Sequence, residues 1–195
     1  MLKVNEIFYS LQGEGCNSGR PAVFVRLSGC NLNCPFCDTM HTTGQPMTEA
    51  DIVAAVAAYE TSWVVITGGE PALQLNAELV DGLHRAGKTV AVETNGTLPL
   101  PPQVDWVTLS PKDLFLGPQA APVLSSVSEL KVVYDGRAEV PEYEHIDVQH
   151  GRYLQPCDTG RPDDNADLVA KTVAYCLAHP QWNLSLQIHK MLNIK

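Results

Sequence analysis

Basic residues are scarce in this 195-residue sequence, which has 13 Lys and Arg against 22 Asp and Glu and a formal net charge of −9. A chain this acidic binds phosphate backbones and anionic lipid surfaces poorly, so neither nucleic acid nor membrane is expected as a partner. No apolar run approaches the roughly 18–20 residues that a transmembrane helix needs. The first ten residues include Lys3, Asn5 and Glu6 and lack the pattern of an export signal. We therefore expect a cytoplasmic protein.

Short apolar strands alternate with amphipathic helices along the chain, which predicts βα units and a mainly parallel sheet. A hydrophobic fraction of 45% suits a folded single domain over residues 1–195. A complete eightfold barrel typically needs about 250 residues, so we expect an α/β fold built as a partial, open barrel. Six core strands are expected at 22–28, 63–67, 89–94, 106–110, 130–134 and 151–155, with three main helices after Thr48, at 76–86 and at 166–177.

Two further segments carry local signals. Thr48, with Asp51 three residues later, predicts a capped helix start. Residues 182–189 alternate between apolar and polar side chains, which predicts a last strand with Ser185, Gln187 and His189 on one face. The proline-rich stretch 113–128 has no clear period, and no element is predicted there.

The six cysteines are placed unevenly, because Cys30, Cys34 and Cys37 fall within eight residues as Cx3Cx2C. No export signal accompanies them, so a reducing compartment and a metal-binding loop fit better than disulfides. Three thiolates leave one position of a metal or cluster open, as catalytic centres require. A zinc site with His41 as fourth ligand and a closed electron-transfer cluster are the alternatives. The other cysteines, Cys16, Cys157 and Cys176, need no special role.

The Cx3Cx2C loop, followed at the end of the next strand by Gly68-Gly69-Glu70-Pro71, resembles the signature of the radical S-adenosylmethionine enzymes. The resemblance implies that the three cysteines, within a loop at 29–45, bind three irons of a [4Fe–4S] cluster. S-adenosylmethionine would chelate the fourth iron and release a 5′-deoxyadenosyl radical. Glu70 would meet the ammonium group of its methionine part. Phe36 would pack near the adenine, or only within its own loop.

Further motifs narrow the resemblance to the 7-carboxy-7-deazaguanine synthases, over about residues 6–195. They are Leu11-Gln12-Gly13-Glu14-Gly15, Arg26, Cys37-Asp38-Thr39, Thr67, Glu93-Thr94-Asn95-Gly96, Ser110-Pro111-Lys112, Gln155-Pro156-Cys157-Asp158 and residues 185–190. This family implies conversion of 6-carboxy-5,6,7,8-tetrahydropterin to 7-carboxy-7-deazaguanine with loss of ammonia, in the biosynthesis of queuosine and other 7-deazapurines. It also implies Mg²⁺, a homodimer and an electron donor such as flavodoxin. A glycyl-radical-enzyme activase shares the cysteine loop but does not need residues 11–15 or the C-terminal tail in these forms.

The resemblance assigns roles residue by residue. Chemically, Gln12 both donates and accepts, Glu14 accepts from an amino group, and Arg26 forks onto a carboxylate. A tail at 182–195 would cap the substrate, with Lys195 acting through its terminal group. Substrate contacts are assigned to Leu11, Gln12, Gly13, Glu14, Arg26, Thr67, His189 and Lys195, with Glu14, Arg26 and His189 as catalytic residues. S-adenosylmethionine contacts are assigned to Phe36, Gly69, Glu70, Asn95, Ser110, Pro111, Lys112, Gln155, Pro156, Cys157 and Asp158, and Mg²⁺ to Thr39.

Overall fold

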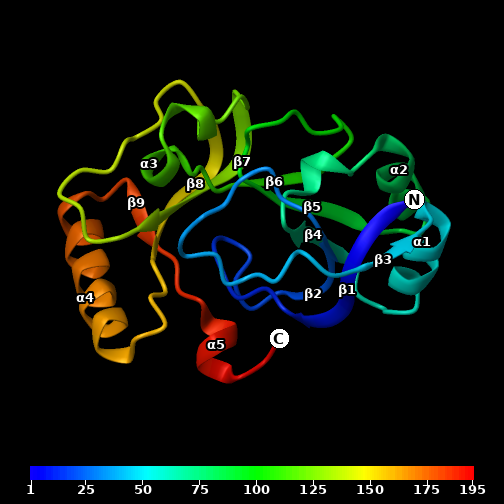
Figure 1. Ribbon diagram of the computed structural model, residues 1–195, viewed down its shortest axis with the longest axis horizontal. Helices are drawn as coiled ribbons and strands as arrows, with labels where there is room; N and C mark the ends of the chain where they lie inside the picture. The colour runs from blue at the N-terminus through cyan, green and yellow to red at the C-terminus, as the bar shows by residue number, and fades with distance from the viewer.

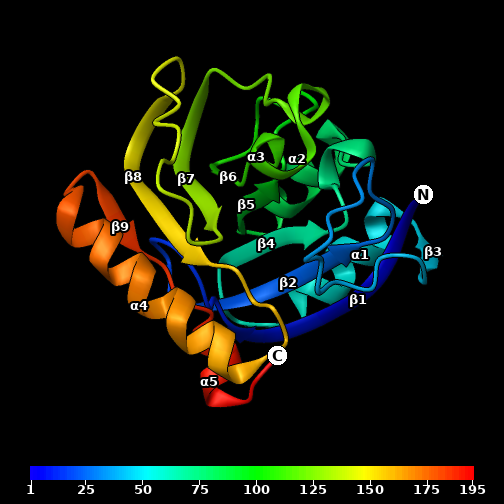
Figure 2. The same ribbon diagram turned by 60° about the vertical axis from the view of Figure 1, so that its left-hand side comes forward.

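A computed structural model describes residues 1–195 and contains one nine-stranded sheet that curls into a partial barrel (Figure 1, Figure 2). The sheet order is β3-β1-β2-β4-β5-β6-β7-β8-β9, and β3 and β9 are not paired, so the barrel stays open. Pairing is parallel from β2 to β9, whereas β1 pairs antiparallel with both β2 and β3. The strands are β1 (Leu2–Leu11), β2 (Pro21–Leu27), β3 (Gln45–Met47), β4 (Trp63–Gly68), β5 (Thr89–Thr94), β6 (Trp106–Leu109), β7 (Ser126–Tyr134), β8 (Asp147–Pro156) and β9 (Trp182–Leu184).

Three main helices cover the outside of the sheet, as predicted. Helices α1 (Glu49–Ala57) and α2 (Ala77–Arg85) pack together over the outer face of β2, β4 and β5, where valine, leucine and isoleucine side chains form the largest core cluster. Helix α4 (Pro162–Ala178) packs on β8 and β9. Shorter pieces are η1 (Pro71–Leu73), α3 (Asp113–Leu116), η2 (Pro118–Ala120) and α5 (Ile188–Leu192). None of the helices combines the length and apolar character needed to cross a bilayer.

Aromatic side chains fill the inside of the barrel at the amino ends of the parallel strands. Phe8 and Phe24 stack with ring centroids 5.0 Å apart, and Trp63 meets Trp106 edge-on at 6.1 Å. Trp63 and Trp106 are the first residues of their strands. This plug leaves the carboxyl ends of the strands as the open end of the barrel, which is where sites lie in such folds.

The open α/β barrel is confirmed, and three local expectations need correction. The predicted strand at 182–189 is wrong, because β9 ends at Leu184 and α5 begins at Ile188. There the Ile188 N–H donates to the Gly13 carbonyl (3.1 Å), so the chain leaves the sheet and crosses its open end. The edge strands β1 and β3 were not predicted. Strands β7 and β8 begin four residues earlier than expected, at Ser126 and Asp147.

Candidate active site

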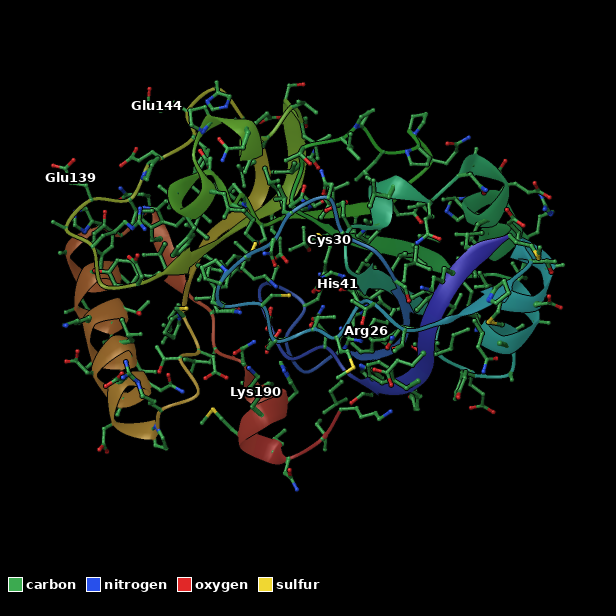
Figure 3. All side chains as sticks on the ribbon, viewed as in Figure 1. Arg26, Cys30, His41, Glu139, Glu144 and Lys190 are labelled. Carbon is green, nitrogen blue, oxygen red and sulfur yellow. The ribbon has the colours of Figure 1, made fainter.

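A cavity of about 550 Å³ opens at the carboxyl ends of the parallel strands. Arg26, Cys30 and His41 lie in the middle of the molecule beside it, with Lys190 on α5 below them (Figure 3). All residues that the resemblance assigns to the site line this cavity except Glu70 and Pro111. The strand-end motifs, separated by up to about 180 positions in the sequence, therefore meet in one place.

The loop between β2 and β3 brings three free thiols, those of Cys30, Cys34 and Cys37, to the cavity wall. Gly69 fits closely beneath this loop, since a Cβ there would lie 1.8 Å from the Gly29 carbonyl oxygen. In an iron–sulfur cluster each thiolate binds a different iron, so three thiols on one loop are a ligand set that a cluster can use.

Lys112 places a positive charge beside the cysteine loop. Its ammonium donates to the Ser110 carbonyl and hydroxyl oxygens, both at 2.6 Å. Burial lowers the pKa of Lys112 to about 8, although the nearby Cys34 opposes that shift. Burial also raises the pKa of the Cys30 and Cys34 thiols, an effect that Lys112 counteracts. The Ser-Pro-Lys segment therefore favours negative charge on this wall.

Glu70 lies under the cavity floor and is only 1% exposed. Its carboxylate accepts hydrogen bonds from the Ala72 N–H (2.9 Å), the Thr94 hydroxyl (2.7 Å) and the Asn95 N–H (2.7 Å). The expected contact between Glu70 and an ammonium stays a prediction, whereas Asn95 does reach the cavity.

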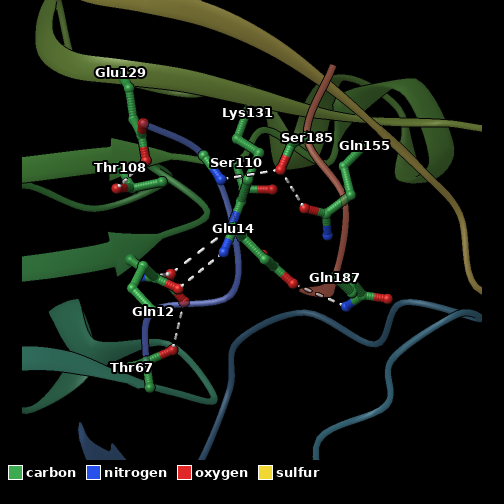
Figure 4. Close-up of polar contacts among 12 residues, drawn as sticks. Gln12, Glu14, Thr67, Thr108, Ser110, Glu129, Lys131, Gln155, Ser185 and Gln187 are labelled. Carbon is green, nitrogen blue, oxygen red and sulfur yellow. Dashed lines mark hydrogen bonds and ion pairs between the residues drawn. The ribbon is translucent and has the colours of Figure 1, made fainter. Parts of the chain in front are cut away.

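A second group of lining residues carries hydrogen-bonding side chains joined in one network (Figure 4). Glu93 at the end of β5 accepts from Gln12 Nε2 and from the Thr67 hydroxyl, both at 3.0 Å. The Gln12 Oε1 atom accepts from the Glu14 N–H at 3.2 Å. We did not assign Glu93 from the sequence. Its signal was a charged residue at an inward position near the carboxyl end of a parallel strand.

Arg26 of β2 points into the barrel and lines the cavity. Its Nε donates to Glu6 Oε1 at 3.1 Å, and its guanidinium lies over the Phe8 ring. The two terminal nitrogens make no hydrogen bond, so they are available for a planar anion. Glu6, which was not assigned, also accepts from Lys195 Nζ at 2.7 Å.

The C-terminal tail crosses the mouth of the cavity as a short helix. His189 lies against Gly13 so closely that a Cβ on Gly13 would be 2.1 Å from its Nδ1. Lys190 donates to Asp38 (2.8 Å) and to Asp158 (2.6 Å), so it joins the cysteine loop to the loop after β8. The hydrogen bond from Lys190 is the main reason that the pKa of Asp158 falls to about 2.

The remaining assigned residues lie at the edges of the cavity. Phe36 lines it while packing edge-on against Phe115, so both expected contacts remain open. The Thr39 hydroxyl lies 3.4 Å from Asp38 Oδ1. Cys157 also reaches the cavity wall. The other walls are completed by Leu11, Ser110, Gln155 and Pro156.

Comparisons with known proteins agree with this geometry. Residues 24–113 match the family model of the radical SAM superfamily. The 7-carboxy-7-deazaguanine synthase of Bacteroides thetaiotaomicron is 48% identical over all of both chains, and that of Nitratidesulfovibrio vulgaris is 43% identical over 98% of each. A crystal structure of QueE from Escherichia coli matches with a TM-score of 0.73 and 29% identity, over 95% of this chain and 93% of that one. The chain therefore belongs to the 7-carboxy-7-deazaguanine synthase family of radical S-adenosylmethionine enzymes.

Proposed function

We propose that the chain converts 6-carboxy-5,6,7,8-tetrahydropterin to 7-carboxy-7-deazaguanine and ammonia, the reaction after which its relatives are named. Family membership implies a [4Fe–4S] cluster and S-adenosylmethionine, which together supply the radical that begins the reaction. The chain would bind the cluster through Cys30, Cys34 and Cys37. Its other residues bind and orient the two organic molecules.

The division of the cavity into two chemically different walls carries this proposal. One wall holds the cysteine loop, Gly69 and Lys112, which suit the cluster and the methionine carboxylate. The other holds a carboxylate–amide network and the free end of Arg26. A pterin acid presents donors and acceptors along its ring edge and a carboxylate, so it complements the second wall.

The same proposal includes the metal ion, the domain organisation, the oligomeric state and the electron donor that the family resemblance implies. Thr39 contributes its hydroxyl to Mg²⁺, and substrate and water oxygens supply the remaining ligands. Residues 1–195 form a single domain, with the cluster loop at 29–45 and the capping tail at 182–195. The enzyme works as a homodimer in the cytoplasm, receives its electron from a donor such as flavodoxin, and supplies queuosine or another 7-deazapurine.

The position of α5 argues against the activase alternative. An activase must admit a peptide loop of its partner protein to the radical. In this chain the mouth of the cavity is crossed by α5, which Lys190 ties to Asp38 and Asp158. A small molecule suits this enclosure better.

Anaerobic reconstitution with iron and sulfide tests the proposal. We expect a brown protein with about four irons per chain. With dithionite, S-adenosylmethionine and the carboxy-tetrahydropterin it should yield 7-carboxy-7-deazaguanine and one ammonia per product. Reductive cleavage of S-adenosylmethionine without that product would overturn the substrate assignment. The Cys34→Ala variant is the matched control, since it should give neither cluster nor product.

A further inference from the structure

Lys131 is a buried lysine that none of the roles above uses. It lies on the inward face of β7, and its side chain is 7% exposed at the cavity wall. Its ammonium forms an ion pair with Glu14 and lies 3.7 Å from Glu93 Oε1. A buried lysine is costly unless it is paired, so this position demands a specific partner.

The loop that carries Glu14 is attached to β7 at a second point. Glu129, two residues before Lys131, accepts from the Cys16 N–H at 2.7 Å and from the Thr108 hydroxyl at 2.8 Å. The Gly15 N–H donates to the Ser185 hydroxyl at 3.0 Å. Figure 4 shows this loop passing between the sheet and the C-terminal segment. The loop after β1 is thus held by groups from the far side of the barrel.

Each carboxylate oxygen of Glu14 has its own partner. Oε2 faces Lys131, and Oε1 accepts from Gln187 Nε2 at 2.8 Å. The amide and the ammonium therefore fix both the position and the rotation of the carboxylate plane. A carboxylate fixed in this way presents its remaining lone pairs to the cavity in one direction. Because an ionised carboxylate only accepts hydrogen bonds, a ligand must meet these lone pairs with N–H or O–H donors.

Electrostatics work in the same sense. Burial disfavours the charged form of Glu14, but Lys131 and Gln187 more than offset it and lower its pKa well below the usual range. Burial likewise opposes the charge on Lys131, and Glu14 and Glu93 together raise its pKa. Lys131 therefore stays an ammonium at neutral pH and is not a proton donor to the reaction. The charged or titratable groups around Glu14 are Lys131 and Glu129 on β7, Glu93 on β5, Lys112 after β6 and His189 on α5.

We propose that Lys131 is a positioning residue that keeps Glu14 ionised and oriented, so that the site selects substrates presenting N–H donors to this wall. The inference rests on the proposed function, because the donor edge it selects is that of the pterin. Lys131 acts through Glu14 and touches no reacting atom. Without the ammonium, the partly buried carboxylates of Glu14 and Glu93 lose the cation they share, and the pKa of Glu14 rises.

The Lys131→Met variant tests this role in the reconstituted enzyme. We expect KM for the carboxy-tetrahydropterin to rise by about tenfold or more, since a charge-stabilised acceptor is lost, with a smaller change in kcat. Because protonated Glu14 no longer accepts, kcat/KM of the variant should fall as pH is lowered through the raised pKa of Glu14. The wild type should lack that acid limb, because Lys131 keeps the pKa of its Glu14 low. Lys131→Arg, which keeps the positive charge, should restore the wild-type pH profile.

The matched control is Lys88→Met. Lys88 is also a buried lysine, but it donates to the Tyr59 and Thr61 carbonyls at 2.5 and 2.8 Å, away from the cavity. It should leave KM and the pH profile unchanged. In a Glu14→Gln background, Lys131→Met should raise KM little further, because the side chain at position 14 that Lys131 acts on is already neutral.

Three results would overturn the inference: an unchanged KM and pH profile in Lys131→Met, an equal loss with and without Glu14, or loss of cluster and S-adenosylmethionine binding in both Lys131 variants. If Lys131→Met does not fold, Lys131→Gln, which removes the charge but keeps a polar side chain, replaces it in the same measurements of KM and pH profile. Failure of the proposed function is distinct, since the wild type itself would then form no product.

Discussion

The Glu70 carboxylate accepts a 2.7 Å hydrogen bond from the backbone N–H of Asn95 and so joins the loops that follow β4 and β5. Its other oxygen accepts from the Thr94 hydroxyl and from the N–H of Ala72 in η1. Three donors, from η1 and from the end of β5 with the residue after it, therefore depend on one buried side chain. This arrangement makes Glu70 an organiser of the cavity floor.

Replacing Glu70 with Ala should lower the free energy of unfolding by roughly 1–3 kcal/mol, because buried donors lose their acceptor. Urea unfolding of the variant measures the loss, and the exposed Glu60→Ala is the control. We also expect weaker S-adenosylmethionine binding, because Asn95 and Gly69 are displaced. A variant of unchanged stability that no longer binds S-adenosylmethionine would instead indicate direct contact with the ammonium.

Local chemistry was predictable from the sequence where neighbouring residues decide it. Thr48 caps α1, and Thr48 and Asp51 form the reciprocal capping box that their spacing predicted. The alternation of apolar and polar residues at 182–189 predicts a strand, but the same pattern also fits a short strand followed by a crossing segment and a helical turn. Tertiary contacts, including the bond from the Ile188 N–H to the Gly13 carbonyl, decide the outcome there.

Site residues that belong to a motif were predictable from the sequence. Residues whose role depends on being buried inside the barrel were not. Glu129 and Lys131 alternate with Leu130 and Val132, a pattern that reads as a strand with one solvated face. In this open barrel that face turns inward, so both charged residues are buried. Only the curvature of the sheet and the loop after β1, neither visible in the sequence, reveal their partners.

The three loop cysteines and the three others should respond differently to substitution. Cys30→Ala, Cys34→Ala and Cys37→Ala should each abolish the cluster and turnover, because each removes one of only three anchors. Cys16→Ser, Cys157→Ser and Cys176→Ser should keep the cluster, since Cys16 is exposed and Cys176 packs against the core. Iron content and visible absorption measure this. Loss of the cluster in Cys157→Ser but not in Cys34→Ala would refute the ligand assignment.

Thr39→Ala should leave cluster assembly intact and weaken the dependence of the rate on Mg²⁺. The hydroxyl is one oxygen ligand among several, so Mg²⁺ should bind more weakly without it. The Mg²⁺ concentration for half-maximal rate should therefore rise, and the plateau rate should be reached only at higher Mg²⁺ concentration. Mg²⁺ titration of kcat/KM gives the comparison, and Thr42→Ala on the same loop is the control. An identical Mg²⁺ response in wild type and Thr39→Ala would remove Thr39 from the metal site.

Lys190→Met should loosen the tail from the cavity mouth, because the ties to Asp38 and Asp158 are lost. Hydrogen exchange at residues 186–195 should accelerate, and S-adenosylmethionine should bind roughly two- to fivefold more weakly, as suits a partly exposed pair. The depressed pKa of Asp158 keeps it charged above about pH 4, so the difference should persist from about pH 5 to 8 and vanish only in acid. Lys171→Met, which breaks an exposed pair with Asp167 on α4, should change neither measurement.

Gly13 leaves the space that the His189 ring occupies, which yields a prediction specific to this packing. A methyl group at position 13 would lie 2.1 Å from His189 Nδ1, so Gly13→Ala must displace the ring or the tail that carries it. A displacement of about 1 Å near reacting groups costs on the order of 10²-fold in kcat/KM. Cluster content should be normal, because the atoms nearest to the new methyl group belong to His189 and not to the cysteine loop.

The double variant separates displacement of His189 from damage to the loop after β1. In a His189→Ala background the methyl group has room, so Gly13→Ala should add little to the loss that His189→Ala causes alone. Steady-state kcat/KM of the wild type, both single variants and the double variant completes this double-mutant cycle. Fully additive losses would mean that Gly13 acts through its own backbone near Gln12 and Glu14, and the contact with His189 would then have no part in the effect.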